Sequence, residues 1–117
     1  MKILITITAL ILSLNPTTSI AQVDESTLEQ LVGWTLIETK TIEGFYNDDG
    51  KYEDSFEGCD YDRVIQFVDS TQIECSSYGY QYAYRPTAFI FGKNTNYKGK
   101  SYTLYKMIVE DDVYDIR

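Results

Sequence analysis

Residues 63–76 read RVIQFVDSTQIECS, and this stretch carries the clearest β-hairpin pattern in the chain. Apolar and polar residues alternate on both sides of a turn at Asp69, Ser70 and Thr71, as they do in strands with one buried face. A turn centred on these residues would place Cys75 opposite Gln66. The alternation assigns four side chains to the core face: Ile65, Phe67, Ile73 and Cys75.

Strand patterns continue on both sides of this hairpin. Residues 34–42 are rich in β-branched side chains and predict the first strand. Residues 87–91 and 101–110 predict two later strands, and residues 113–116 predict a short last one. Residues 92–100, which are rich in Gly, Asn and Lys, predict a loop.

Residues 24–32 predict a short helix before the strands, because Ser26 and Glu29 have capping-box spacing. Three apolar side chains recur there at helical spacing: Leu28, Leu31 and Val32. We therefore expect a mainly β protein, in which a short N-terminal helix precedes five or six antiparallel strands. These strands should curl into a small barrel or half-barrel of the SH3-like or OB-like type. The predicted core consists of Leu28, Leu31, Trp34, Leu36, Ile65, Phe67, Ile73, Phe89, Phe91, Leu104 and Ile108.

Length and composition limit the function. The chain has 117 residues, which is the size of one domain. It has no His, which excludes a Ser–His–Asp triad, a Cys–His pair and an imidazole metal site. With 10 Lys and Arg against 18 Asp and Glu, the net charge is −8. This charge argues against nucleic acid as a partner, because phosphates attract basic surfaces.

Residues 1–21 have the features of a secretory signal peptide. One basic residue precedes an uncharged, mostly apolar run at 3–14, which is too short for a bilayer span of about 20 residues. Ser19 and Ala21 are the small residues of a cleavage site. The alternative is a buried N-terminal strand, since the Ile-Thr-Ile-Thr run is β-prone. We favour the signal peptide and expect one periplasmic or secreted domain at 22–117, with no membrane insertion after cleavage.

Cys59 and Cys75 are the only cysteines in the chain. In an oxidising compartment, two cysteines of a small domain usually form a disulfide. Two thiolates without His do not complete a zinc site, and the pair lacks the C-x-x-C spacing of redox motifs. We therefore predict a structural disulfide that ties the loop before the hairpin to the second strand of the hairpin.

Residues 77–86 read SYGYQYAYRP. If this segment is extended, four tyrosines project from one face: Tyr78, Tyr80, Tyr82 and Tyr84. Gly79 and Ala83, on the other face, permit the close approach of another element. Tyrosines together with Arg85 are typical of surfaces that bind proteins, and sugars also stack on aromatic rings. The alternative is structural, because cross-strand tyrosine pairs stabilise a sheet and can cover a small core.

The segment 48–62 is rich in carboxylates. Five of them form the candidate acidic loop: Asp48, Asp49, Glu53, Asp54 and Glu57. When Gly50 is aligned with the glycine of an EF-hand, Phe45 and Phe56 occupy the first and last ligand positions, which excludes that calcium motif. An irregular Ca²⁺ site and a solvated acidic loop stay open as alternatives, and we expect no metal or cofactor.

The same carboxylates do not specify a catalytic pair. A catalytic acid needs an apolar pocket that raises its pKa, and this segment offers no apolar run to build one. Neither a nucleophile with a base nor an oxyanion site is evident elsewhere in the chain. We therefore expect no catalytic residues and no enzyme activity.

Charge is segregated along the chain. Residues 22–74 have 14 acidic and 3 basic side chains, residues 75–109 have no acidic and 5 basic ones, and residues 110–117 have 4 acidic and 1 basic. We favour an interpretation in which folding interleaves these charges, because neighbouring strands often pair opposite charges. The alternative is a basic face at the tyrosines and a separate acidic loop.

Three features together resemble a group of small secreted bacterial hypothetical proteins, some of them carried on mobile elements or gene cassettes. These features are residues 57–63 (EGCDYDR), Cys75, and the tyrosine-rich run from Tyr78 to Pro86. The resemblance covers residues 57–91, about half of the mature chain. It implies a shared disulfide and sheet, and it implies no activity and no catalytic residue.

Two functions fit these features. The first is an exported, non-catalytic binding module whose partner is a protein or an envelope glycan. Its contacts would come from Tyr78, Tyr80, Tyr82, Tyr84 and Arg85. The second is a periplasmic inhibitor or immunity protein that uses the acidic loop against a cationic enzyme such as a lysozyme or a toxin. Opposite charges would speed that association and make it sensitive to salt.

Overall fold

The computed structural model describes residues 24–117, so the predicted signal peptide at 1–21 lies outside the described residues. This part of the chain is mainly β, with one short helix. Its elements are α1 (Glu25–Glu29), β1 (Thr35–Tyr46), β2 (Tyr52–Glu53), β3 (Val64–Phe67), β4 (Gln72–Glu74), β5 (Thr87–Tyr97), β6 (Lys100–Val109) and β7 (Asp112–Ile116).

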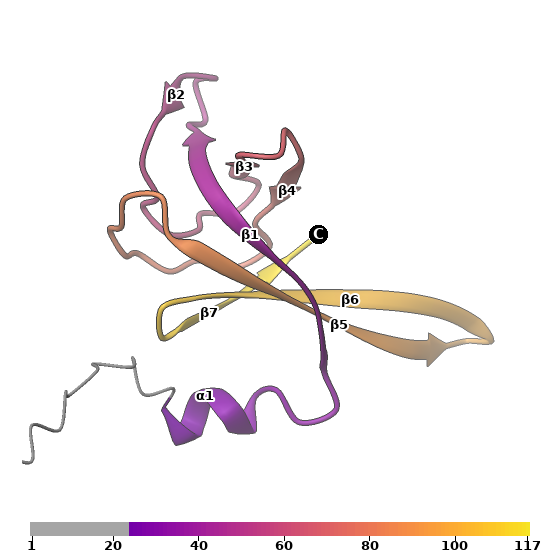
Figure 1. The fold of residues 1–117 in the computed structure, drawn as a ribbon. Helices are drawn as coiled ribbons and strands as arrows, with labels where there is room; N and C mark the ends of the chain where they lie inside the picture. Colours follow the sequence, from indigo (N-terminus) through magenta and orange to yellow (C-terminus); the bar gives the residue numbers. More distant parts are fainter. Residues whose placement is uncertain (1–23) are drawn as a thin grey trace, which may run out of the picture.

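The strands form an antiparallel half-barrel (Figure 1). Six of them follow the order β4-β3-β1-β5-β6-β7, and the two-residue β2 pairs with the end of β1. The first and last strands of this order also meet. The backbone N–H groups of Glu74 and Arg117 each donate to the other's carbonyl at 2.9 Å, and Cys75 forms a bridge with Ile116. The two edges of the half-barrel therefore touch where the end of β4 meets the end of β7.

The hairpin at 63–76 forms as predicted, with a different register. Ile65 lies opposite Ile73, and the N–H of Cys75 donates to the carbonyl of Arg63 at 2.8 Å rather than facing Gln66. The reason is the turn, in which Ser70 adopts a left-handed backbone with φ of 73°. The loop between the strands therefore consists of residues 68–70, and this shifts the pairing of the two strands from the one we predicted. All four predicted core-face residues still point inward, with Ile73 partly buried.

Buried side chains from every sheet strand except β2 and β4, together with Phe56, Cys59, Cys75 and Ala83, form the core. The predictions of Ile65, Phe67 and Ile108 as buried residues are confirmed. Leu31, Trp34 and Phe91 are half-buried. Four predicted core residues are exposed, so that part of the prediction is wrong: Leu28, Leu36, Phe89 and Leu104.

The errors on β5 and β6 come from choosing the wrong face. The register pairs Ala88 with Val109 and Ile90 with Met107, and all four of these side chains are buried. Successive side chains on a strand point to opposite faces, so Phe89 turns outward. The sequence pattern missed this because both faces of β5 carry apolar residues.

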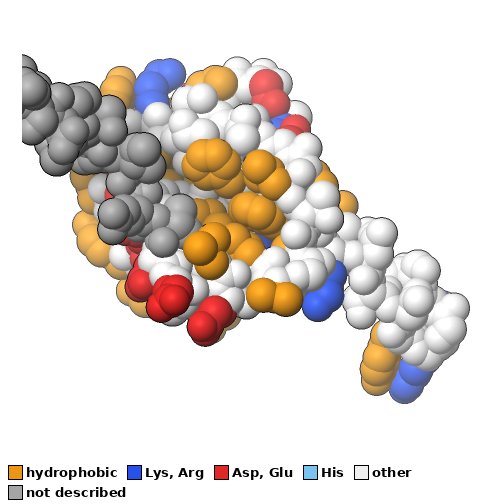
Figure 2. Space-filling view, turned by 60° about the horizontal axis from the view of Figure 1, so that its bottom comes forward, with side chains coloured by type: hydrophobic (Ala, Val, Ile, Leu, Met, Phe, Trp, Pro, Cys, Tyr) orange, Lys and Arg blue, Asp and Glu red, His pale blue; other side chains and the backbone are white. Residues whose placement is uncertain are grey.

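The predicted loop at 92–100 is instead the outer half of a long hairpin. Pairing of β5 and β6 continues to Tyr97 and Lys100, and Lys98 and Gly99 form a turn in which both have positive φ. Side-chain hydrogen bonds join the strands, from Ser101 Oγ to Asn96 Oδ1 at 2.9 Å and from Thr103 Oγ1 to Asn94 Oδ1 at 3.0 Å. The hairpin projects beyond the half-barrel and carries hydrophobic and basic side chains at its tip (Figures 1 and 2).

Helix α1 is shorter than predicted, and Asp24 rather than Ser26 is its N-cap residue. The hydroxyl of Ser26 donates to the Asp24 carboxylate at 3.1 Å, so the predicted capping box does not form. The helix contacts the turn between β6 and β7, where the buried Thr27 donates from Oγ1 to the carbonyl of Asp111 at 3.3 Å. Among residues 24–117, no helix has the length and apolar character needed to cross a membrane.

Candidate binding surface

The four tyrosines at 78, 80, 82 and 84, here called the tyrosine row, lie on an extended segment that runs beside residues 56–59. Phe56 and Ala83 exchange backbone hydrogen bonds at 2.9 Å, and Cys59 and Gly79 do so at 2.8 and 2.9 Å. The rings of the row are all 64–68% exposed, whereas Ala83 is buried. The predicted alternation is therefore confirmed, with the tyrosines outward and Gly79 and Ala83 inward.

The two bridges have unequal spacing. Two residues, Glu57 and Gly58, lie between them on one segment, and three residues, 80–82, lie between them on the other. The tyrosine segment thus carries one extra residue, which is the pattern of a β-bulge. Gly58 permits this close approach, because it has φ of 82° and a Cβ there would collide with the carbonyl oxygen of Gly79. Bulges re-aim side chains and are frequent beside functional sites.

Tyr114 on β7 supports the row from the inside. Its ring is buried and lies against Gly79, where a Cβ would come within 3.0 Å of Tyr114 Cε1. Its hydroxyl donates to Gln81 Oε1 at 2.6 Å, and its ring packs edge-on against Phe56 with 5.7 Å between centroids. Burial, together with the nearby carboxylates of Asp112 and Glu110, raises the pKa of Tyr114 well above its usual range. The phenol therefore keeps its proton and its hydrogen bond to Gln81.

The predicted disulfide between Cys59 and Cys75 is present, and both cysteines are buried. Cys59 is bridged to Gly79 in the tyrosine segment, and Cys75 is bridged to Ile116 where the two edges of the half-barrel touch. The bond therefore ties the loop before the hairpin to the end of β4, as predicted. It also anchors the inner side of the tyrosine row to the half-barrel.

Arg85, at the end of the row, makes a cation–π contact with the ring of Tyr84. Its guanidinium lies 5.7 Å from the centroid of Tyr84. Within residues 24–117, no basic group and no second ring lies over Tyr78, Tyr80 or Tyr82. In the described part of the chain, the row thus forms none of the aromatic pairs that the structural alternative predicts.

The acidic loop leads into the same surface. Four of its carboxylates are exposed and Glu57 is half-buried, and none of the five forms an ion pair within the described residues. Antiparallel pairing places Glu57, which follows Phe56, opposite the bulge at 80–82. The acidic loop therefore reaches the tyrosine row at Glu57.

The predicted interleaving of charges occurs only in part. Of the five basic residues at 75–109, only Lys106 forms an ion pair within the described part of the chain, at 2.9 Å from Asp115. Lys98 and Lys100 lie at the tip of the projecting hairpin, and Lys98 covers Tyr97 at 5.3 Å. The other ion pairs join Lys40 to Glu38 and Asp69, and Arg117 to Asp62 and Glu74.

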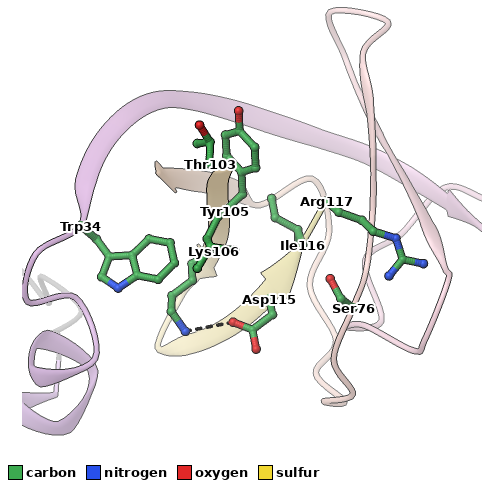
Figure 3. A pocket seen from close by; sticks show the side chains of 9 residues that line it. Trp34, Ser76, Thr103, Tyr105, Lys106, Asp115, Ile116 and Arg117 are labelled. Atoms are coloured by element: carbon green, nitrogen blue, oxygen red, sulfur yellow. Dashed lines mark hydrogen bonds and ion pairs between the residues drawn. The ribbon is translucent and has the colours of Figure 1, made fainter. Parts of the chain in front are cut away.

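A separate pocket of about 520 Å³ lies where Trp34 faces β6 and β7 (Figure 3). Its charged groups already have partners, since Lys106 Nζ pairs with Asp115 and lies 5.1 Å from the Trp34 ring centroid. Arg117, at its other side, pairs with Asp62 and Glu74. No member of the tyrosine row lines this pocket.

Within residues 24–117, no group of three Asp, Glu or Cys side chains is placed to hold a metal ion. Asp49 contributes to the turn of this loop, where its Oδ1 accepts the N–H of Lys51 at 3.0 Å.

Sequence reasoning missed two residues that hold the surface in place. One is Tyr114, although the period-two pattern of Tyr114 and Ile116 could have placed both in the core. The other is Arg63, whose guanidinium donates to the carbonyls of Glu57 and Gly58 at 3.3 and 3.2 Å and lies 4.4 Å from the ring centroid of Phe45. No pattern in the sequence indicates these contacts, because the pairing of β1 with β3 is what brings Phe45 beside Arg63.

Comparison of the chain with protein-family models, with curated proteins and with solved structures found no match in any of the three.

Proposed function

We propose that this protein is an exported, non-catalytic binding module that holds a protein or an envelope glycan on the tyrosine row. The observation that carries the proposal is the exposure of four tyrosines on one side of a single segment. Backbone hydrogen bonds to Phe56 and Cys59 hold that segment in place. Tyrosine combines a large apolar ring with a polar hydroxyl, and it is enriched where proteins bind their partners. Arg85 borders the row and is also a residue type enriched at such surfaces.

The contacts that restrain the tyrosine segment favour a binding function. Four backbone hydrogen bonds, the disulfide at Cys59 and the hydroxyl of Tyr114 restrain the segment before any partner arrives. A preorganised surface loses little conformational entropy on association, so more of its contact energy contributes to affinity. The rings are rigid as well, with two rotatable bonds each, and lose little freedom when they are covered.

Export to the periplasm or beyond the cell is part of the proposal. Its support is the disulfide, which persists in oxidising compartments, together with the signal-peptide pattern of residues 1–21. The finer fold assignment, a small barrel of the SH3-like or OB-like type, is proposed with it. The support for that assignment is the contact between β4 and β7, which brings the two edges of a short antiparallel sheet together.

The experiment compares two double variants of the oxidised protein from residue 22 onward. Tyr80→Ser with Tyr82→Ser removes the centre of the row, and Tyr97→Ser with Tyr102→Ser removes two exposed tyrosines of the projecting β5–β6 hairpin. Each protein is immobilised and exposed to a soluble envelope extract and to purified cell-wall glycan. Bound proteins are identified by mass spectrometry, purified, and titrated against each variant.

We expect the row variant to lose the partner while the control pair retains it. Both should melt within about 2 °C of the wild type, since exposed side chains contribute little to stability. Undiminished binding by the row variant would contradict the proposal. A fall of more than about 8 °C in its melting temperature would show instead that the row is structural.

The second candidate function, an inhibitor or immunity protein against a cationic enzyme, is favoured by one observation. The carboxylates of the acidic loop form no ion pairs within the described residues and lead directly into the tyrosine row. Its test is the fourfold change of Asp48, Asp49, Glu53 and Asp54 to Asn or Gln. Capture of a lysozyme or another cationic enzyme should fall, and undiminished capture by this variant would reject the inhibitor function.

A further inference from the structure

The tyrosine row presents three uncovered rings to solvent. The faces of aromatic rings carry negative potential and attract cations to within about 6 Å of the centroid. This chain uses that attraction repeatedly, with Arg85 over Tyr84 at 5.7 Å, Lys98 over Tyr97 at 5.3 Å and Lys106 over Trp34 at 5.1 Å. In the described part of the chain, the rings of the row at 78, 80 and 82 have no such partner.

The segment that runs beside these rings is acidic. Phe56 is buried, so alternation along its segment turns Glu57 to the outer side, opposite the bulge at 80–82. Asp54 precedes it, is exposed and, like Glu57, forms no ion pair within the described residues. Two bases lie nearby: Arg85 is held over Tyr84, and Arg63 donates to the backbone carbonyls of Glu57 and Gly58.

We propose that the tyrosine row binds an extended protein segment with Lys or Arg at alternate positions. This inference rests on the proposed function and names the chemistry of the partner. Alternate residues of an extended chain lie about 6.6 Å apart, and the tyrosines of the row stand at alternate positions of a segment with one bulge. Successive basic groups can therefore sit over successive rings, with Glu57 beside the middle of the row.

Charge complementarity selects this occupant over the others. An acidic segment would be repelled by Glu57 and by the negative charge of the chain. A neutral glycan would stack on the rings but would draw no benefit from the carboxylates around them. A basic segment uses the rings and the carboxylates together, and the net charge of −8 favours its approach.

The experiment uses two synthetic peptides as probes, an acetylated and amidated (Lys-Thr)₅ and the matched (Gln-Thr)₅. A neutral linear oligosaccharide is the third probe. Each is titrated into the oxidised protein from residue 22 onward, at roughly 0.01 M and roughly 1 M salt, where the screening lengths are about 30 and 3 Å. The readouts are calorimetry and the chemical shifts of the tyrosine rings.

We expect the Lys peptide to bind at least about tenfold more tightly than the Gln peptide at low salt, and to lose most of that advantage at high salt. Tyr80→Ser with Tyr82→Ser should weaken its binding by about five- to thirtyfold. Glu57→Gln should weaken it by about two- to fivefold. Arg85→Gly, which removes a positive charge beside the row and suits the left-handed backbone at φ of 46°, should tighten the binding of the Lys peptide at low salt.

The experiment distinguishes failure of the basic-segment inference from failure of the proposed binding function. Equal binding of both peptides, or tighter binding of the oligosaccharide, overturns the basic-segment inference. The binding function survives that result if the row variant still weakens the bound probe. If the Lys peptide binds equally well to the row variant, both the inference and the proposed function fail for this surface. Weaker binding of the Lys peptide to Arg85→Gly would show that Arg85 attracts the peptide rather than repels it, and would also overturn the inference.

Discussion

The ring of Tyr114, near the end of the chain, lies directly against the backbone of Gly79 in the middle of the tyrosine segment. A Cβ at position 79 would stand 3.0 Å from Tyr114 Cε1, and the hydroxyl of the same ring donates to Gln81 Oε1 at 2.6 Å. A buried ring on β7 thus determines how closely the tyrosine segment packs on the half-barrel.

Gly79→Ala should destabilise the protein by about 1–3 kcal/mol, because the added methyl group meets a buried ring that has little room to move. Gly92→Ala is the matched control, since a Cβ there meets Ile37 and Thr103 at ordinary contact distances of 3.5–3.7 Å. That control should be neutral or slightly stabilising. Urea unfolding measures both, and equal stabilities for the two variants would show that Tyr114 does not pack against position 79.

Tyr114→Phe keeps the ring and removes the hydroxyl, which leaves Gln81 Oε1 without its donor. We expect a loss of about 1–2 kcal/mol in the free energy of unfolding. We also expect faster amide exchange in residues 79–83, which the Gln81 contact restrains. Tyr78→Phe, which removes an exposed hydroxyl, should change neither quantity. Unchanged exchange at 79–83 in Tyr114→Phe would mean that the backbone bridges alone hold the row.

Reduction of the Cys59–Cys75 bond should lower stability by roughly 3 kcal/mol, since the bond joins residues 16 apart and restricts the unfolded chain. The measurement is the melting temperature with and without a thiol reductant. The double variant Cys59→Ala with Cys75→Ala serves as the control, and its melting temperature should not respond to the reductant. A wild-type shift of the same size as that of the control would contradict a stabilising role for the bond.

Acid should remove the contribution of Asp69 at the hairpin turn. Hydrogen bonds from Lys40 and Thr71 lower the pKa of Asp69 from 3.8 to about 2. Because the pKa is lower in the folded than in the unfolded state, the carboxylate stabilises the fold above about pH 4, and this contribution is lost as the pH falls towards 2. Lys40 stays charged throughout this range, because its pKa is raised above 10.5.

The measurement is the melting temperature of Asp69→Asn and of the wild type between pH 2 and 7. The variant should melt lower than the wild type at neutral pH, and the difference should shrink as the pH approaches about 2. Asp48→Asn, in the exposed acidic loop, is the control and should track the wild type at each pH. A difference in melting temperature between Asp69→Asn and the wild type that stays constant with pH would show that the charge of Asp69 does not contribute to stability.

Local patterns in the sequence were enough for the hairpin at 63–76 and for the disulfide. Alternation around Ile65 and Ile73 involves neighbours a few residues apart, and it survives an error in the turn because both strands keep their inward faces. The same rule failed on β5, where Phe89 and Ile90 are both apolar and only the partner strand decides which of them is buried. It failed on 92–100 too, because Asn and Lys at loop-like positions pair across a tight turn at Lys98 and Gly99.

The sequence by itself determined the mainly β character, the Cys59–Cys75 bond and the alternation of the tyrosine row. These depend on residue chemistry and on the period of two along an extended chain, which are local properties. Only the tertiary structure decided that the rings face solvent, that Tyr114 supports them and that the acidic loop adjoins them. Those relations join residues far apart in the chain, and they follow from the strand order and the bulge opposite Glu57 and Gly58, which no local pattern specifies.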